Sequence, residues 1–487
     1  MSDLASLLVP SLRWNATHGF RYLDDSIASA LALGVGGFLI RGGPRDAVSA
    51  LTADLHARSR IPLLIAAAAE RGAGQEFDGC TALPPLGALG HAGAFSLSDI
   101  GRAATLTARE LKQLGINWAL APVCDLDLDP GCPIIGTRSA GADPASVSAL
   151  LEQWIDACQA EGVLACAKHF PGHGRAAGDS HRTLPAVRAR ARELAEADLV
   201  PFRAAMDAGV ASVMTAHVAY PLLDRGGGPA TLSAPILRDL LRGELEFDGL
   251  VVSDELQMDA LRAAGPEADV AIRAIAAGCD VLLAPMDVAG VARALERAAL
   301  DGTLSTERSR DAVERRDRWA GWGRPSRGRE TTLGDLMWAR KLADRSIHVV
   351  RGSLPRVGEA LEIVEVDDDA GGTWTIPSRA HFAEALRALD VDAPVVVEPT
   401  SNTRVPVVIA AYSDVIPWKG TAGFSGPSRD RIAHTIAAAT AQRRESVVVL
   451  FSHPRHASQL VSAPNILCAW GGEPPMQSAA ARVLARG

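Results

Sequence analysis

The chain has 487 residues, 48% of them hydrophobic and 22% charged, so it can bury a large core and is neither one small binding module nor a disordered or fibrous protein. Its formal charge is −8, from 49 basic and 57 acidic residues without a basic stripe, which disfavours nucleic acid and anionic membranes as partners. This balance favours a small, neutral molecule as the partner.

Cysteine usage and the amino-terminal sequence bear on the compartment. None of the seven cysteines forms a C-x-x-C pair, so neither a disulfide framework nor a zinc ribbon is indicated. The first residues, MSDLASLLVPSLRW, carry an acidic residue where a secretory signal has positive charge, and no apolar run approaches the roughly 18 to 20 residues that span a bilayer. We therefore expect a soluble protein of the cytoplasm, with no membrane partner.

The first two thirds of the chain alternate short apolar runs with helical patterns, as β-α units around a parallel sheet do. One helical stretch, between the fourth and fifth runs, has a single apolar face that includes Val147, Leu151, Trp154 and Cys158. Eight strand-helix repeats in about 320 residues predict an α/β fold of the (β/α)8 TIM-barrel type. The predicted strands are residues 7–10, 35–40, 61–68, 117–121, 163–168, 211–216, 250–254 and 280–284.

The sequence AGWGRPSRGRETT that follows Trp319 is rich in glycine, proline and arginine and has no apolar period. It predicts a linker at residues 326–334, between a catalytic barrel at 1–325 and a smaller α/β sandwich domain at 335–487. Nothing in the second domain looks catalytic, so a packing role is expected for it. Its predicted strands are residues 347–350, 361–366, 394–397, 405–411, 446–451 and 466–470, with a helix at 429–440.

The carboxyl ends of barrel strands are where active sites are built, and polar residues gather there in this chain. Lys168 is one of only four lysines, and it stands between an apolar run and His169. The alternative for Lys168 is a lysine that merely extends its charge to solvent, and for His169 a hydrogen-bonded core histidine. The adjacency of the two favours a functional site.

Two further candidates are the acidic residues Asp179 and Asp254, whose positions in the sequence suggest a functional carboxylate. Asp179 and His181 are two residues apart in the glycine-containing loop 171–183, a spacing at which a carboxylate can orient an imidazole for proton transfer. Asp254 follows the apolar run LVVS, where an unpaired carboxylate is costly, so it is either functional or ion-paired. The Asp-x-His spacing is common and indicates less than the position of Asp254 does.

A metal site is the alternative use of the histidines, because His169, His173, His181 and His217 all follow predicted strands. Pro171, however, prevents the helix that would place His169 and His173 on one face, so no metal is expected. The Gly-x-Gly sequences lack the strand, helix and acidic residue of a dinucleotide site. No cofactor is expected either.

Taken together, the residues at the strand ends resemble the family 3 glycoside hydrolases, in their β-N-acetylglucosaminidase branch. The motif KHFPGHG followed by DSH, at residues 168–181, is highly specific. The sequences APV-x-D with IIGTRS (121–139), MTAHVAYP (214–221) and VVSDELQMDA (251–260) occur in the expected order. The resemblance covers the whole predicted barrel, and the second domain resembles the sandwich of two-domain members.

The resemblance implies a role for each matching residue. Asp254 corresponds to the nucleophile that forms a glycosyl-enzyme intermediate, and His181 to the general acid/base, with Asp179 as its partner. This agrees with the chemistry of a retaining glycosidase, and histidine suits proton transfer because it ionises near neutral pH. Lys168, His169 and Arg138 match positions that bind the sugar next to the cleaved bond; Arg138 has the alternative of a structural pairing with Asp125.

One departure from the family concerns the third predicted strand, where an Asp-x-Glu sequence is replaced by Ala68-Ala69-Glu70. Losing a charge-assisted hydrogen bond to the sugar costs about 1.5 to 3 kcal/mol. The leading expectation is a retaining exo-β-N-acetylglucosaminidase that acts on sugars derived from muropeptides or chitin, as in peptidoglycan recycling. The alternatives are a β-N-acetylglucosaminide phosphorylase, since a histidine repels phosphate less than a carboxylate does, and a sugar-binding pseudoenzyme impaired at Ala68.

Overall fold

The structure is a computed structural model that describes residues 4–91, 95–322, 330–369, 376–401 and 403–486. The chain forms two compact units. The first comprises Met1–Ala82, Phe95–Asp129 and Ser139–Thr332, and the second comprises Leu83–Ala94, Pro130–Arg138 and Leu333–Gly487. Two short segments from the first half of the chain thus belong to the second unit. The predicted linker, 326–334, lies partly outside the described residues, which resume at 330.

The first unit is built on short, buried strands that all pair in parallel. Hydrogen bonds join them in the orders β2-β3-β4-β5, β6-β7-β8 and β1-β9. Single parallel bridges add two further links, Trp118 of β5 with Leu164 and Val252 of β8 with Val281. The strands are β1 (Leu8–Val9), β2 (Ser11–Arg13), β3 (Gly37–Arg41), β4 (Leu64–Ala67), β5 (Trp118–Ala119), β6 (Cys166–Phe170), β7 (Ser212–Thr215), β8 (Leu250–Val252) and β9 (Leu282–Leu283).

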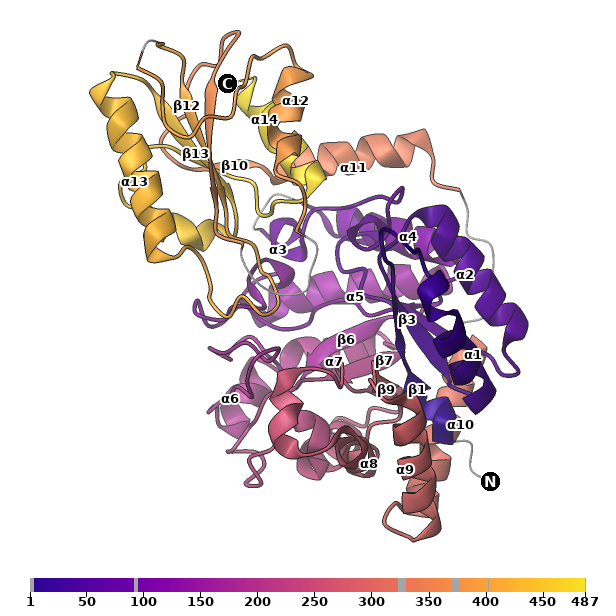
Figure 1. The fold of residues 1–487 in the computed structure, drawn as a ribbon. Helices are drawn as coiled ribbons and strands as arrows, with labels where there is room; N and C mark the ends of the chain where they lie inside the picture. Colours follow the sequence, from indigo (N-terminus) through magenta and orange to yellow (C-terminus); the bar gives the residue numbers. More distant parts are fainter. Residues whose placement is uncertain (1–3, 92–94, 323–329, 370–375, 402, 487) are drawn as a thin grey trace. The chain divides into compact units, whose positions relative to one another are not determined.

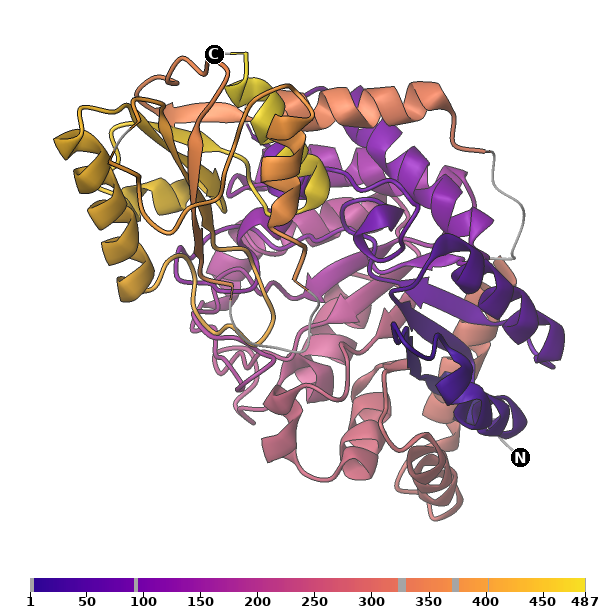
Figure 2. The same cartoon turned by 45° about the horizontal axis from the view of Figure 1, so that its top comes forward.

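Helices alternate with these strands along the chain. Figure 2, in which the first unit is coloured from indigo to rose, shows its strands inside and its helices outside. No described helix is both long and apolar enough to cross a membrane. The longer helices of this unit are α1 (Asp24–Leu33), α2 (Arg45–Arg58), α4 (Leu97–Gln113), α5 (Pro144–Ala160), α6 (Ala191–Glu196), α7 (Val200–Asp207), a π-helix (Pro235–Glu244), α8 (Glu267–Ala277), α9 (Val288–Leu300) and α10 (Thr306–Trp322).

Helix α5 illustrates how local sequence sets an element in place. Asp143 caps it by accepting a hydrogen bond from the backbone N–H of Ser146, and Pro144 occupies the first turn, where a missing N–H costs nothing. The predicted apolar face is confirmed, since Val147, Trp154 and the rest of that face are buried, apart from Leu150, which is half-buried.

The second unit contains one sheet of five strands, in the order β10-β14-β13-β12-β11. Only β10 is antiparallel, and its partner is β14. The predicted strand at 394–397 is wrong: it forms a single bridge between Val395 and Ile363, because Pro394 has no N–H to donate and Val397 is left exposed. The strands are β10 (His348–Arg351), β11 (Glu362–Asp367), β12 (Val407–Tyr412), β13 (Ser446–Phe451) and β14 (Ile466–Cys468).

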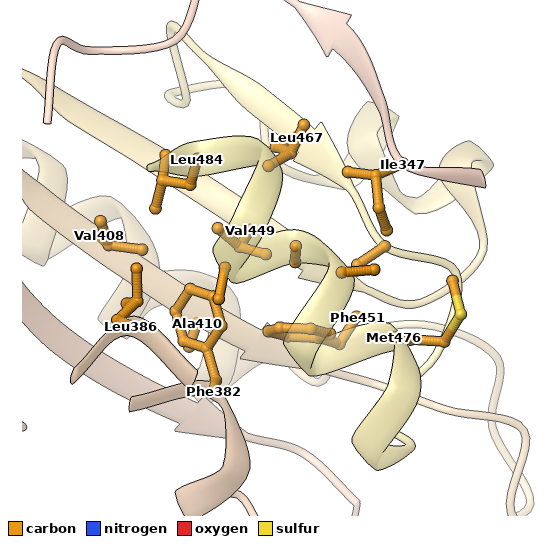
Figure 3. Packing of buried hydrophobic residues seen from close by; sticks show 14 of the residues in the cluster. Ile347, Phe382, Leu386, Val408, Ala410, Val449, Phe451, Leu467, Met476 and Leu484 are labelled. Carbon is orange, nitrogen blue, oxygen red and sulfur yellow. The ribbon is translucent and has the colours of Figure 1, made fainter. Parts of the chain in front are cut away.

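Helices cover both faces of this sheet (Figure 1), so successive residues of a strand enter different cores. Val408 and Ala410 of β12 pack into one core with residues of α12 and α14, whereas Ile409 and Ala411 pack with residues of α13. Figure 3 shows the first core, with Phe382 and Phe451 among its largest side chains. The helices are α3 (Leu86–Leu89), α11 (Leu333–Ser346), α12 (Ala380–Arg387), α13 (Gly426–Ala441) and α14 (Pro474–Leu484). The two units confirm the predicted α/β class.

Candidate active site

Strand β6 carries two of the predicted site residues. Lys168 and His169 lie within the strand, which extends to Phe170 rather than ending at residue 168 as predicted. The Nζ atom of Lys168 is 2.6 Å from Oε1 of Glu70, which follows β4, and their side chains are only 4% and 11% exposed. A lysine buried against a carboxylate is not one that extends to solvent, so that alternative for Lys168 is wrong.

The imidazole of His169 is oriented by a buried carboxylate. Asp125 accepts hydrogen bonds through Oδ2 from Nδ1 of His169, at 2.7 Å, and from its backbone N–H, at 3.1 Å. Its Oδ1 accepts from the backbone N–H of His173 at 2.5 Å. Burial raises the pKa of Asp125, but His169 and these hydrogen bonds outweigh it and hold the pKa below its ordinary value. Asp125 is therefore ionised, and the ring of His169 has a fixed orientation.

Asp179 and His181 form the pair that their spacing predicts. Oδ1 of Asp179 accepts from the backbone N–H of His181 at 2.9 Å and lies 2.8 Å from Nδ1 of its ring. Since a carboxylate oxygen only accepts, Nδ1 carries a proton and Nε2 is the nitrogen available for proton transfer. The side chain of Asp179 is 1% exposed, whereas that of His181 is 16% exposed, so only the ring of the pair reaches toward solvent.

Asp254 lies two residues beyond the end of β8. Its Oδ1 accepts from the backbone N–H of Glu255 at 2.8 Å. Burial raises the pKa of this carboxyl, but nearby His169 and the hydrogen bond from the N–H of Glu255 lower it by more, and the net pKa is about 2. Histidines from the ends of β6 and β7 thus lie near Asp254, and it is charged at neutral pH.

His217, which the sequence offered only as a metal ligand, follows β7 and is buried. Its Nε2 lies 3.1 Å from the backbone carbonyl of Glu255, and its Nδ1 lies 2.7 Å from the hydroxyl of Thr231. The carbonyl can only accept, so Nε2 is protonated, and burial lowers the pKa of the ring below its ordinary value. A neutral His217 with both nitrogens occupied by protein groups positions the residues after β8.

Sequence reasoning missed a buried ion network beside this group. Arg41, the last residue of β3, pairs with Glu255 and, at 3.0 Å, with Glu76. The arginine is 6% exposed. The sequence did contain a signal for Arg41, because this charged residue directly follows the apolar run 35–40, just as Asp254 follows the apolar run LVVS.

Arg138 and Ala68 are the two remaining features that the sequence singled out. Arg138 ends a short helical turn (Gly136–Arg138) in the second unit, where its Nη1 donates to the carbonyl of Ile134 at 2.7 Å. Its sugar-binding role and its alternative pairing with Asp125 both stay predictions. Ala68 follows β4 and is 8% exposed. A buried methyl group thus occupies the position at which the resemblance implies a carboxylate.

No group of three or more His, Cys, Asp or Glu side chains in the described ranges is arranged to hold a metal ion. The side chains of the first unit supply a charged carboxylate, an imidazole with its own carboxylate partner, and a lysine and a histidine held in fixed orientations.

Comparison with known proteins identifies the family. Residues 30–318 match the Glycosyl hydrolase family 3 N terminal domain. The chain belongs to this family. It is 35% identical to a beta-N-acetylglucosaminidase/beta-glucosidase of Cellulomonas fimi over 380 residues, covering 74% of this chain and 67% of the relative. A beta-hexosaminidase of Chromobacterium violaceum is 36% identical over 323 residues, 65% of this chain and 88% of the relative.

A solved structure extends the similarity to both units. The family 3 beta-N-acetylglucosaminidase of Paenibacillus sp. str. FPU-7 is similar with a TM-score of 0.87 and 26% identity, covering all of this chain and 96% of the other. The resemblance drawn from the strand-end motifs is thereby confirmed, and this family 3 member is a glycoside hydrolase.

Proposed function

We propose that this family 3 enzyme is a retaining exo-β-N-acetylglucosaminidase that releases terminal N-acetylglucosamine through a glycosyl-aspartate intermediate. The observation that carries the proposal is the division of labour between two acidic groups. Asp254 is ionised among three imidazoles, whereas Asp179 is committed to His181 through two hydrogen bonds. A nucleophile must be charged, as Asp254 is. A proton donor must be held in a fixed orientation, and Asp179 holds His181 in this way.

In the first step, a carboxylate oxygen of Asp254 forms a bond to the anomeric carbon while the bond from that carbon to the leaving oxygen breaks. His181, protonated on both nitrogens, gives its Nε2 proton to the leaving oxygen and becomes neutral. Asp179 stabilises the imidazolium before transfer and keeps Nδ1 protonated afterwards.

In the second step, neutral His181 takes a proton from water through Nε2 as the water oxygen attacks the anomeric carbon. The bond from that carbon to Asp254 breaks, and its electron pair returns to the carboxylate. The sugar leaves with its original anomeric configuration, and both residues recover their starting protonation.

Three residues are proposed to bind the sugar next to the cleaved bond. Lys168, His169 and Arg138 match the family positions for this role, and the fixed orientations of Lys168 and His169 suit hydrogen bonds to hydroxyl groups. The names of the Cellulomonas relative and of the Paenibacillus structure support N-acetylglucosamine as the sugar. We propose oligosaccharides derived from muropeptides or chitin as the substrates, and a place for the enzyme in peptidoglycan recycling in the cytoplasm.

The finer architecture is part of the same proposal. In the first unit, sheets and single bridges link each strand from β2 to β9 with the next one in the chain. Strand β9 also pairs with β1, and β1 is followed directly by β2. We therefore propose that these strands close into a (β/α)8 barrel. The catalytic barrel would span 1–325 and be joined through a linker, 326–334, to the α/β sandwich domain 335–487. The candidate nucleophile and proton donor then come from the carboxyl side of the barrel strands.

Initial rates on p-nitrophenyl N-acetyl-β-glucosaminide and on the corresponding glucoside test the proposal, each with and without phosphate. We expect the natural chain to turn over the N-acetyl substrate and Asp254→Asn to abolish this turnover. Ala68→Asp should raise kcat/KM by about one to two decades if the new carboxylate binds the sugar. A rate that depends on phosphate, with glycosyl phosphate as product, would replace hydrolysis with phosphorolysis. Turnover only in Ala68→Asp would mean that the natural chain binds sugar without cleaving it.

A further inference from the structure

Two acidic residues, Asp254 and Glu255, stand side by side after β8, and their surroundings differ. The carboxylate of Asp254 faces histidines, as described above. Glu255 is 14% exposed and is held by its neighbours on every side: its Oε1 accepts from Nη2 of Arg41, and its Oε2 accepts from Nε2 of Gln257. Each oxygen of Glu255 thus has a partner within the protein.

The backbone of Glu255 is held as firmly as its side chain. Its carbonyl accepts from Nε2 of His217 at 3.1 Å, and its N–H donates to Oδ1 of Asp254 at 2.8 Å. The hydrogen bond that fixes the carboxylate of Asp254 therefore comes from a residue whose carbonyl and side chain are anchored separately. A shift of Glu255 would move the donor and with it the carboxylate.

Arg41 is suited to anchor Glu255 because of its geometry. Its guanidinium uses one Nη for Glu255 and the other for Glu76, whose side chain is only 5% exposed. Burial lowers the pKa of the guanidinium and the two carboxylates raise it more, so Arg41 stays charged. A planar fork can serve two carboxylates at once, whereas an ammonium is a single point charge.

We propose that Arg41 is a positioning residue for the nucleophile: by fixing Glu255, it fixes the N–H that holds Oδ1 of Asp254 and leaves Oδ2 directed at the anomeric carbon. The inference rests on the proposed role of Asp254. A displacement of about 1 Å at a reacting group costs on the order of 10²-fold in rate, so a modest loosening of this anchor is measurable.

The test replaces Arg41 by lysine and compares it with the same replacement at a buried arginine of helix α10, Arg316. Arg316 is also fully buried and donates through Nη2 to the carbonyl of Gly36, at 2.8 Å, just before the opposite end of β3. Arg316→Lys therefore perturbs a buried arginine of the same unit without touching Glu255. Thermal unfolding of both variants gives the stability lost in each.

The kinetic readout uses phenyl and dinitrophenyl N-acetyl-β-glucosaminides, with free N-acetylglucosamine as an inhibitor. Arg41→Lys is expected to lower kcat by about 10- to 100-fold with both aglycones, because nucleophilic attack is needed whichever group leaves. Its inhibition constant for free N-acetylglucosamine should stay within about twofold, since the sugar-binding groups are unchanged, whereas an altered sugar contact would raise it. Arg316→Lys should leave kcat and the inhibition constant near those of the natural chain.

Three outcomes overturn the positioning role: an unchanged kcat in Arg41→Lys, a fall in kcat that Arg316→Lys matches at equal loss of stability, or a raised inhibition constant, which would mean that the sugar contacts have changed. If Arg41→Lys does not fold, Glu255→Gln is measured instead, since it keeps the shape of the side chain and weakens its bond to Arg41; kcat must fall there too. Asp254→Asn separates the two proposals, because turnover in that variant refutes the nucleophile itself, whereas its inactivity beside an active Arg41→Lys refutes only the positioning.

Discussion

Replacing Asp179 by asparagine and by alanine should separate the charge of this residue from its hydrogen bonds. Its Oδ1 accepts from both the backbone N–H and the Nδ1–H of His181. The backbone group can only donate, so an asparagine at this position would keep its amide oxygen toward His181. Asp179→Asn therefore preserves the geometry and the tautomer and removes only the negative charge.

The expected losses follow from hydrogen-bond energies. A bond to a charged group contributes about 1.5 to 3 kcal/mol and a neutral one about 0.5 to 1.5, so Asp179→Asn should cost about 1 to 1.5 kcal/mol, or roughly tenfold in kcat/KM. Asp179→Ala also releases the ring and should lose about 10² to 10⁴-fold, the usual contribution of general acid-base catalysis.

The assay is kcat/KM against pH for the phenyl and dinitrophenyl N-acetyl-β-glucosaminides. Dinitrophenolate leaves without protonation, so the losses should be large for phenyl and small for dinitrophenyl. Asp301→Asn is the matched control, because Oδ1 of this exposed residue accepts from the N–H of Thr303, also two positions later, at 2.9 Å. Equal losses with both aglycones, or none in Asp179→Ala, would refute the assignment of His181 as the proton donor.

Further predictions concern stability. A Cβ at Gly174 would lie 1.7 Å from the carbonyl oxygen of Leu126, so Gly174→Ala should lower the unfolding free energy by about 1 to 3 kcal/mol in urea, while Gly228→Ala, with no atom within 4 Å of its Cβ, should not. Because the pKa of Asp254 is below its ordinary value, its ionisation stabilises the fold above about pH 4. The difference in unfolding free energy between the natural chain and Asp254→Asn should therefore fall as the pH drops toward 2. A difference that stays constant with pH would contradict this. Asp280 is fully buried and pairs with two arginines. Its replacement by alanine should lower the unfolding free energy by about 3 to 5 kcal/mol, measured by thermal unfolding, and leave KM unchanged in kinetic assays.

The order of the strands and several residues near Asp254 could be predicted because both depend on local sequence. A buried parallel strand is a continuous apolar run, and a charged residue directly after it is conspicuous, which singled out Lys168 and Asp254. The same signal at Arg41 went unused. The strand predicted at 394–397 failed because β-type composition does not reveal whether a neighbouring strand has donors and acceptors in register.

The partners of these residues could not be predicted. Nothing in the sequence joins Lys168 to Glu70 or Arg41 to Glu255, because residues far apart in the chain meet only after the strands pair. The assignment of Leu83–Ala94 and Pro130–Arg138 to the second unit has the same origin. It depends on long-range packing, which hydrophobic periodicity does not encode.

That assignment also bears on how the protein is made and handled. Ala88 is buried in the same core as Leu361 and Leu484, although it leaves the ribosome hundreds of residues before them. The core of the second unit therefore stays incomplete until Leu484 has been synthesised, and its folding requires contacts of long sequence separation, which form slowly. A chain cut after Thr332 would leave two apolar segments without their partners, and residues 333–487 alone would lack part of their own core. Expression and mutagenesis therefore need a chain that contains both units.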